Sequence, residues 1–248
     1  MQQRKHRDKI VLSFSEVDKV KALVLCKVKN SLKLDFDATY LFIDDLSNLS
    51  GLRRSLTREF VASEAHHIAF VSRFEDKFEA KTIVDELTAH EAQVKMFCDD
   101  VADQVFFLAV MKQCSQQLAP IKGVIQMAMI LRDVLIENMS YEEWTIPLRP
   151  KVQGTWNLHQ HFGHERPLDF MIFCSSISGL WGKLGQAQYI AGNSYQDALA
   201  HYRRAEGLNA VSIDLGIMLD VGVIAETGAH NFKVWEEIQL HHFLVAFR

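Results

Sequence analysis

Short apolar runs alternate along the chain with longer stretches in which apolar residues recur at helical spacing. The short runs are rich in β-branched and aromatic residues and predict strands, whereas the longer stretches predict helices. The predicted strands are residues Thr39–Ile43, 68–72, 94–98, 123–127, 170–174 and 210–215. The predicted helices lie near residues 53–63, 77–90, 103–117, 140–162 and 188–206.

The order of these elements predicts an α/β fold. Strands that are apolar on both faces and alternate with helices form parallel βαβ units, and right-handed crossovers then give a doubly wound sheet with helices on both faces. Such sheets bind ligands at the carboxyl ends of their strands. Ser140 followed by Glu143 predicts a capping box at the start of the fourth helix.

Two regions of unequal size are expected. Residues 1–36 hold two short strand-like runs, at 10–13 and 22–25, that are flanked by charged residues, and we interpret them as an extended lead-in segment. Residues 37–248 form one domain, because 248 residues suit a single large α/β domain and no internal repeat is present.

Composition narrows the function classes. The hydrophobic fraction of 48% and the charged fraction of 23% are typical of a globular protein. A net charge of −4 disfavours a nucleic-acid partner, because proteins that bind phosphate backbones normally carry a basic surface. The sequence contains neither a stretch of 18 apolar residues nor a secretory signal, so we expect no membrane partner.

The cysteines indicate a reducing compartment. The chain has four cysteines and no C-x-x-C pair, which predicts free, buried thiols and a cytoplasmic location. Cys98 and Cys174 end two of the predicted strands and are expected to be buried there.

Candidate chemistry is concentrated in residues 173–197. Tyr189 and Asn193 are four residues apart on a predicted helix and therefore share one face. Ser176 ends the preceding strand, and Lys151 follows Pro150 further upstream. An ammonium near a phenol lowers the phenol's pKa, which is normally about 10. Together, these groups could hold a carbonyl and protonate its oxygen while a hydride reaches its carbon.

These residues, in this order, resemble the ketoreductase domain of fungal highly reducing polyketide synthases, a branch of the short-chain dehydrogenase/reductase superfamily. The resemblance extends over about residues 33–245 and implies a Rossmann-type fold. The best-matching stretches are residues 33–41, 120–133, 137–144, 149–159, 175–204 and 211–228.

The resemblance implies a reaction and a role for each residue. Tyr189 would be the general acid, Ser176 would bind the substrate carbonyl, and Lys151 and Asn193 would complete the catalytic tetrad. The reaction would be the NADPH-dependent reduction of a β-ketoacyl thioester to the β-hydroxyacyl thioester. The substrate would arrive in trans on an acyl-carrier protein. The same tetrad would also serve for a free carbonyl compound.

The expected cofactor loop departs from the family pattern. The resemblance implies a glycine-rich run after the first strand, but residues 44–50 read DDLSNLS, and residues 51–53 form an excess before the predicted helix. Ser47 and Ser50 would take the place of cofactor-binding glycines. Asp44 and Asp45 would repel a diphosphate, unless nearby arginines compensate. The alternative function is therefore a catalytically silent ketoreductase-like domain with impaired NADPH binding.

Other cofactor positions match the family. Arg73, after the second strand, would pair with the 2′-phosphate of NADPH. Asp100 or its neighbour Asp99, together with Val101, would lie near the adenine, and Ala128 would lie along the nicotinamide side.

Two further expectations concern the end of the chain and the histidines. The resemblance implies a lid, a helix and a final strand after residue 228, and residues 231–248 leave no room for that strand. The exposed sheet edge that results would invite association with other chains. His159, His161 and His164 form an H-x-H-x-x-H pattern that we interpret as solvated or capping residues and not as metal ligands, because helical residues two apart face different ways.

Overall fold

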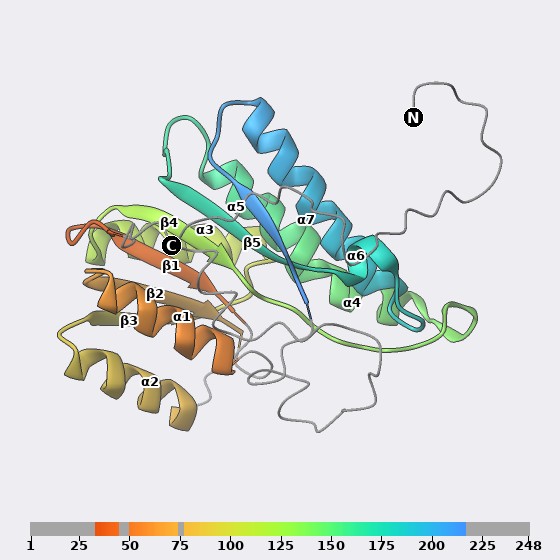
Figure 1. The fold of residues 1–248 in the computed structure, drawn as a ribbon, viewed down its shortest axis with the longest axis horizontal. Helices are drawn as coiled ribbons and strands as arrows, with labels where there is room; N and C mark the ends of the chain where they lie inside the picture. The colour runs from red at the N-terminus through yellow and green to blue at the C-terminus, as the bar shows by residue number, and fades with distance from the viewer. Residues whose placement is uncertain (1–32, 45–49, 74–76, 217–248) are drawn as a thin grey trace, which may run out of the picture. The chain divides into compact units, whose positions relative to one another are not determined.

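The computed structural model describes residues 33–44, 50–73 and 77–216 of the chain (Figure 1). Six strands in these ranges form one parallel sheet with the order β3-β2-β1-β4-β5-β6. They are β1 (Thr39–Ile43), β2 (His67–Ser72), β3 (Gln93–Cys98), β4 (Ile121–Gln126), β5 (Phe170–Ser176) and β6 (Val211–Leu215). The strand order reverses between β1 and β4, so the predicted doubly wound α/β fold is confirmed.

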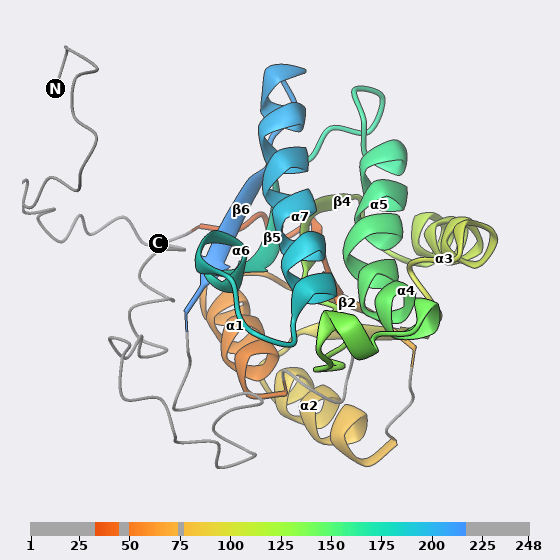
Figure 2. The same ribbon diagram turned by 90° about the vertical axis from the view of Figure 1, so that its right-hand side faces the viewer.

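Helices cover both faces of the sheet. The α-helices are α1 (Ser50–Ala62), α2 (Lys77–Ala89), α3 (Gln104–Gln117), α4 (Tyr141–Arg149), α5 (Thr155–His161), α6 (Ser178–Trp181) and α7 (Ala187–Ala205). A short 3-10 helix spans Ile136–Asn138. Figures 1 and 2 show α1 and α2 on one face and α3, α5 and α7 on the other. In the described ranges, no helix has the length and apolar character needed to span a membrane.

The alternation of side chains along β1 explains why the sheet is buried on both sides. Leu41 and Ile43 pack in the cluster formed with α3, α5 and α7. Tyr40 and Phe42 point the other way and pack against α1 and α2. Every residue of β1 is buried, as expected for a central parallel strand.

The predicted helix over residues 140–162 is divided into three helical segments. Between α4 and α5, a π-helical turn spans Pro150–Gly154. Pro150 has no backbone N–H, so the regular hydrogen-bond ladder is interrupted there. The predicted capping box is confirmed: Ser140 N donates to Glu143 Oε2 (2.7 Å), and Glu143 N donates to Ser140 Oγ (3.2 Å).

Two local expectations are wrong. Residues 51–53 do not separate a loop from a helix; they lie in the first turn of α1. Cys98 is exposed, whereas Cys114 and Cys174 are buried, and all three are free. The reason is that Cys98 is the last residue of β3, the outermost strand on its side of the described sheet.

The boundary at residues 36 and 37 stays a prediction. Leu34, just before it, is buried, and its N–H donates to the carbonyl oxygen of Ser63 (2.9 Å). Cys26 and the expected shortening of the sheet after residue 228 lie outside the described residues.

Candidate active site

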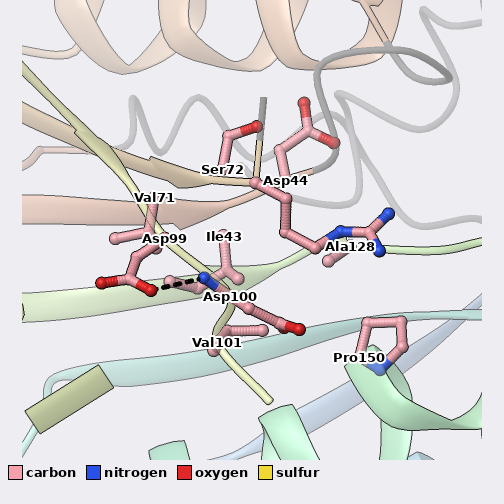
Figure 3. Close-up of a pocket in the computed structure, with 10 residues that line it drawn as sticks. Ile43, Asp44, Val71, Ser72, Asp99, Asp100, Val101, Ala128 and Pro150 are labelled. Carbon is pink, nitrogen blue, oxygen red and sulfur yellow. Dashed lines mark hydrogen bonds between the residues drawn. The ribbon is translucent and has the colours of Figure 1, made fainter. Parts of the chain in front are cut away.

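A recess lies at the carboxyl ends of the central strands, where the strand order reverses (Figure 3). Doubly wound sheets bind ligands at this place, because the loops diverge on either side of the reversal. The recess brings together four of the predicted cofactor-binding residues, Arg73, Asp100, Val101 and Ala128. Its other lining residues are Ile43, Asp44, Val71, Ser72, Asp99 and Pro150.

The other two predicted cofactor residues belong to the segment between β1 and α1. Ser47 lies outside the described residues. Ser50 is the first residue of α1, and its side chain also lies outside the described part of the structure. In the described structure, the recess is lined by residues at and just after the strand ends and by Pro150 of the π-helical turn.

A buried ion pair connects the end of β1 to α1. Arg53 Nη1 lies 3.0 Å from Asp44 Oδ2, and each side chain is 2% exposed. The guanidinium also lies over the ring of Phe70, 6.0 Å from its centroid. Asp44 lines the recess, so Arg53 is a cation that offsets its charge there. This arrangement weakens the predicted repulsion of a diphosphate by Asp44.

Both candidate adenine-side carboxylates line the recess. The backbone N–H of Asp100 donates to Asp99 Oδ1 (2.8 Å), as the dashed line in Figure 3 shows. Asp100 accepts from Ala102 N (2.9 Å) and pairs with Arg149 Nη2 (3.3 Å). These contacts fix the Asp100 carboxylate at the end of β3.

Gln126 connects the recess to the π-helical turn, a link that the sequence analysis missed. Its Nε2 donates to the carbonyl oxygen of Pro150 (2.8 Å), and its Oε1 accepts from Ala128 N (3.0 Å). Gln126 is completely buried, so both contacts are shielded from water. The backbone around Ala128 is thereby held against the segment that carries Lys151.

The four predicted catalytic residues come from three neighbouring elements. Ser176 ends β5, Tyr189 and Asn193 lie on α7, and Lys151 lies in the π-helical turn. Gly192 allows α7 to approach that turn closely, because a Cβ atom at this position would lie 3.1 Å from the Cβ of Lys151.

The pKa of Tyr189 is raised, and not lowered as a nearby ammonium alone would predict. Burial raises the pKa of its phenol, and hydrogen bonding by Ser176 and Asn193 lowers it only in part. The hydroxyl lies 3.9 Å from Met129 Sδ. A neutral phenol next to a serine hydroxyl retains the proton that a general acid donates.

The Lys151 side chain is buried, with the residue 1% exposed, and its amine makes two hydrogen bonds. Its Nζ donates to the carbonyl oxygen of Cys174 and to Gln196 Oε1, each at 3.0 Å. Nζ also lies 5.4 Å from the centroid of the Tyr189 ring. Burial lowers the pKa of the amine to about 8, against the opposing influence of Cys174 and the Asp197 carboxylate.

Asn193 and Ser176 have fixed positions beside Tyr189. Asn193 is fully buried, and its Nδ2 donates to the carbonyl oxygen of Tyr189 (2.9 Å). Its Oδ1 is buried and, among the described residues, has no hydrogen-bond partner. Ser176 Oγ accepts from Ser178 N (3.2 Å). An unsatisfied buried amide oxygen is suited to hold an ordered water.

Gln196 and Thr155 are further polar residues that the sequence analysis did not identify. Both are fully buried, and Gln196 Nε2 donates to Thr155 Oγ1 (3.1 Å). The signal that could have found Gln196 is its spacing. It follows Asn193 by three residues and therefore shares the same face of α7.

The histidine pattern is only partly solvated. His164 is exposed, but His161 is half-buried, with its ring 5.7 Å from that of Phe107. His159 contacts the rings of Trp156 and Tyr202. The expectation of solvated histidines is therefore wrong for His161, because its ring packs against the apolar cluster.

Comparison with a family model places residues 47–220 in the KR domain family. The chain is 63% identical over 240 residues to the reducing polyketide synthase hmp8 of Hypomyces subiculosus, and 59% identical over 240 residues to the highly reducing polyketide synthase ZEA2 of Gibberella zeae. Each alignment covers 96% of this chain and 10% of the relative, so the chain spans about a tenth of the length of these synthases.

Solved structures agree with this result. A ketoreductase domain from the bacillaene assembly line is 26% identical with a TM-score of 0.75, and the match covers 85% of this chain and 52% of that one. PlmKR1, the ketoreductase of the first module of phoslactomycin biosynthesis in Streptomyces sp. HK803, is 27% identical with a TM-score of 0.75, covering 85% and 49%. The chain therefore belongs to the ketoreductase (KR) domain family of the short-chain dehydrogenase/reductase superfamily, in the branch of the fungal highly reducing polyketide synthases.

Proposed function

We propose that this domain reduces a β-ketoacyl thioester to the β-hydroxyacyl thioester with NADPH, and that an acyl-carrier protein delivers the substrate in trans. The observation that carries the proposal is the convergence of Tyr189, Ser176, Lys151 and Asn193 on neighbouring elements. These residues are close to the recess along the chain. Lys151 directly follows Pro150, which lines the recess. Met129, which contacts the Tyr189 hydroxyl, directly follows Ala128, which also lines it.

The position of the recess supports a dinucleotide site. It lies at the reversal of strand order, where such cofactors bind in doubly wound sheets. Asp100, Val101 and Ala128 would contact the cofactor, with Ser47 and Ser50 approaching its diphosphate. Arg73 would pair with the 2′-phosphate, which favours NADPH over NADH. When bound, NADPH supplies the hydride for the substrate carbon.

The side chains divide the remaining work of the reduction. The Ser176 hydroxyl would hold the substrate carbonyl, and Tyr189 would donate its phenolic proton to the carbonyl oxygen. The Lys151 ammonium would stabilise the resulting phenolate. Asn193 Oδ1, which has no hydrogen-bond partner in the part of the chain that the structure describes, would hold a water that returns a proton toward the site.

A catalytically silent domain is the second candidate. Its support is the segment after β1, where glycines are absent and the Asp44 carboxylate lines the recess. Side chains in such a loop keep the backbone away from a diphosphate. The buried Arg53 is the observation that favours the active enzyme over this candidate.

One titration separates the two candidates. NADPH is added to the purified chain, and tryptophan fluorescence quenching with energy transfer to the nicotinamide is recorded. Saturable micromolar binding, followed by turnover of a β-ketoacyl thioester, supports the reductase. The absence of binding at millimolar NADPH, from a chain that circular dichroism shows to be folded, supports the silent domain.

A further inference from the structure

Three buried side chains form a continuous hydrogen-bonded chain that ends on Lys151. Gln196 Nε2 donates to Thr155 Oγ1 (3.1 Å), and Lys151 Nζ donates to Gln196 Oε1 (3.0 Å). Thr155 and Gln196 are 0% exposed and Lys151 is 1% exposed. Such a network is shielded from water, so each of its bonds restricts the position of its neighbour.

The chemistry of lysine fixes the orientation of the Gln196 amide. An ammonium group has donors only, so the amide atom that faces it must be the oxygen. The NH₂ group must then point to Thr155, whose hydroxyl oxygen can accept. A reversed amide would place N–H groups against the ammonium.

The bonds of Lys151 leave one direction open. A protonated amine has three N–H groups. In the described structure, two of them are occupied by neutral acceptors, the carbonyl oxygen of Cys174 and Gln196 Oε1. The Tyr189 ring lies beside the amine, with its centroid 5.4 Å from Nζ. Among the described residues no acceptor occupies the third N–H, which leaves it for the neighbouring phenol.

We propose that Gln196 is a positioning residue. Its neutral amide oxygen holds Nζ of Lys151 so that the third N–H of the lysine stays available to the Tyr189 phenol. The proposal deepens the proposed function and rests on it for the role of Tyr189. Gln196 itself does not touch the reacting atoms.

The neutral charge of the amide is the essential property. A carboxylate at this position would pair with the ammonium and retain its proton. An apolar side chain would leave a buried N–H without an acceptor and favour the neutral amine. The titratable groups that face Lys151 are Tyr189 and Asp197 on α7 and the Cys174 thiol on β5. The first two lie on the same helix as Gln196.

A direct titration of the lysine amine tests the proposal. The full chain is labelled with ¹³C at lysine Cε, and the Lys151 resonance is assigned by its loss in Lys151→Met. We expect Gln196→Glu to raise the pKa of the Lys151 amine by about one unit or more, and Gln196→Met to lower it. Gln153→Glu is the matched control. Gln153 is exposed and bonds to Asn157, so this variant should leave the titration unchanged.

The pH profile of thioester reduction gives a second readout. The alkaline limb of this profile should shift in the same direction as the pKa of the Lys151 amine, to higher pH in Gln196→Glu and to lower pH in Gln196→Met. KM for the thioester should change little. Thr155→Val keeps Gln196 but removes the hydroxyl oxygen that accepts from its amide. This variant should lower kcat and shift the alkaline limb less than the two Gln196 variants do. This variant also tests the network if a substitution of Gln196 prevents folding.

The outcomes separate the inference from the proposed function. Folded Gln196 variants whose Lys151 titration matches that of the wild type would overturn the inference, whether or not the enzyme is active. If the titration responds as expected but the wild type neither binds NADPH nor reduces the thioester, the positioning inference stands and the proposed function is rejected.

Discussion

The guanidinium of Arg53 lies 3.0 Å from the carboxylate of Asp44, and both side chains are almost completely removed from solvent. The contact joins the carboxyl end of β1 to the first turn of α1. Its position is significant because the loop between these elements is where the family has a glycine-rich run. In this chain, a charge and its counter-charge flank the corresponding segment.

Loss of the Arg53 cation should destabilise the domain. Arg53→Met leaves the Asp44 carboxylate buried without its guanidinium partner, which typically costs about 3–5 kcal/mol. The free energy of unfolding in urea measures this cost. Arg58→Met is the matched control on the same helix, because the side chains of the Arg58–Glu86 pair are 53% and 25% exposed and the pair should contribute at most about 1 kcal/mol. Equal losses in the two variants would contradict the expected importance of burial.

Most of the fold follows from the spacing of apolar residues. The six predicted strands all occur, because runs such as Thr39–Ile43 are apolar on both faces and fit only the interior of a parallel sheet. The exposure of Cys98 did not follow from the sequence. Whether a strand is central or outermost depends on the connections between strands. The hydrophobicity of the strand's own residues does not predict its position in the sheet.

The candidate site was predictable where its residues are close in sequence or follow a family pattern. Tyr189 and Asn193 share a face of α7 by their spacing alone. The contact between Lys151 and Gln196 joins residues 45 positions apart, and the Asp44–Arg53 pair depends on how α1 packs against β1. Such contacts are products of tertiary packing, and no periodicity along the chain encodes them.

Tyr189→Phe should remove the reductase activity and leave cofactor binding intact. The substitution deletes the donated proton and keeps the ring, so we expect turnover to fall by about 10²–10⁴-fold or more. NADPH affinity, measured by fluorescence titration, should be nearly unchanged. Tyr195→Phe is the matched control, because it removes a phenolic hydroxyl from the same helix outside the tetrad. Full turnover in Tyr189→Phe would reject the assignment of the general acid.

Arg73→Met should reduce the preference for NADPH over NADH. A charge-assisted hydrogen bond to the 2′-phosphate contributes about 1.5–3 kcal/mol, which corresponds to a loss of roughly 10- to 150-fold in NADPH affinity. NADH has no 2′-phosphate and serves as the internal control, so its affinity should remain constant. Parallel weakening for both cofactors would show that Arg73 supports the recess and does not read the phosphate.

His161 should make the domain sensitive to mild acid. Burial against Phe107, together with the nearby charge of Arg166, lowers the pKa of its imidazole to about 4 from the ordinary value of 6.5. Between these values the unfolded chain binds the proton and the folded chain does not, so stability falls as the pH decreases from about 6.5 to 4. Urea unfolding at several pH values in this window measures the slope.

The slope should be smaller in His161→Gln, which cannot take up the proton in either state. The pKa values of the partly buried His67 and His159 are also lowered, so these residues contribute to the wild-type slope, and the difference between the two proteins is the relevant quantity. His164→Gln is the matched control, because His164 is exposed and three residues away, and it should retain the wild-type slope. If His161→Gln also retained that slope, the imidazole would not be buried against α3 as the structure places it.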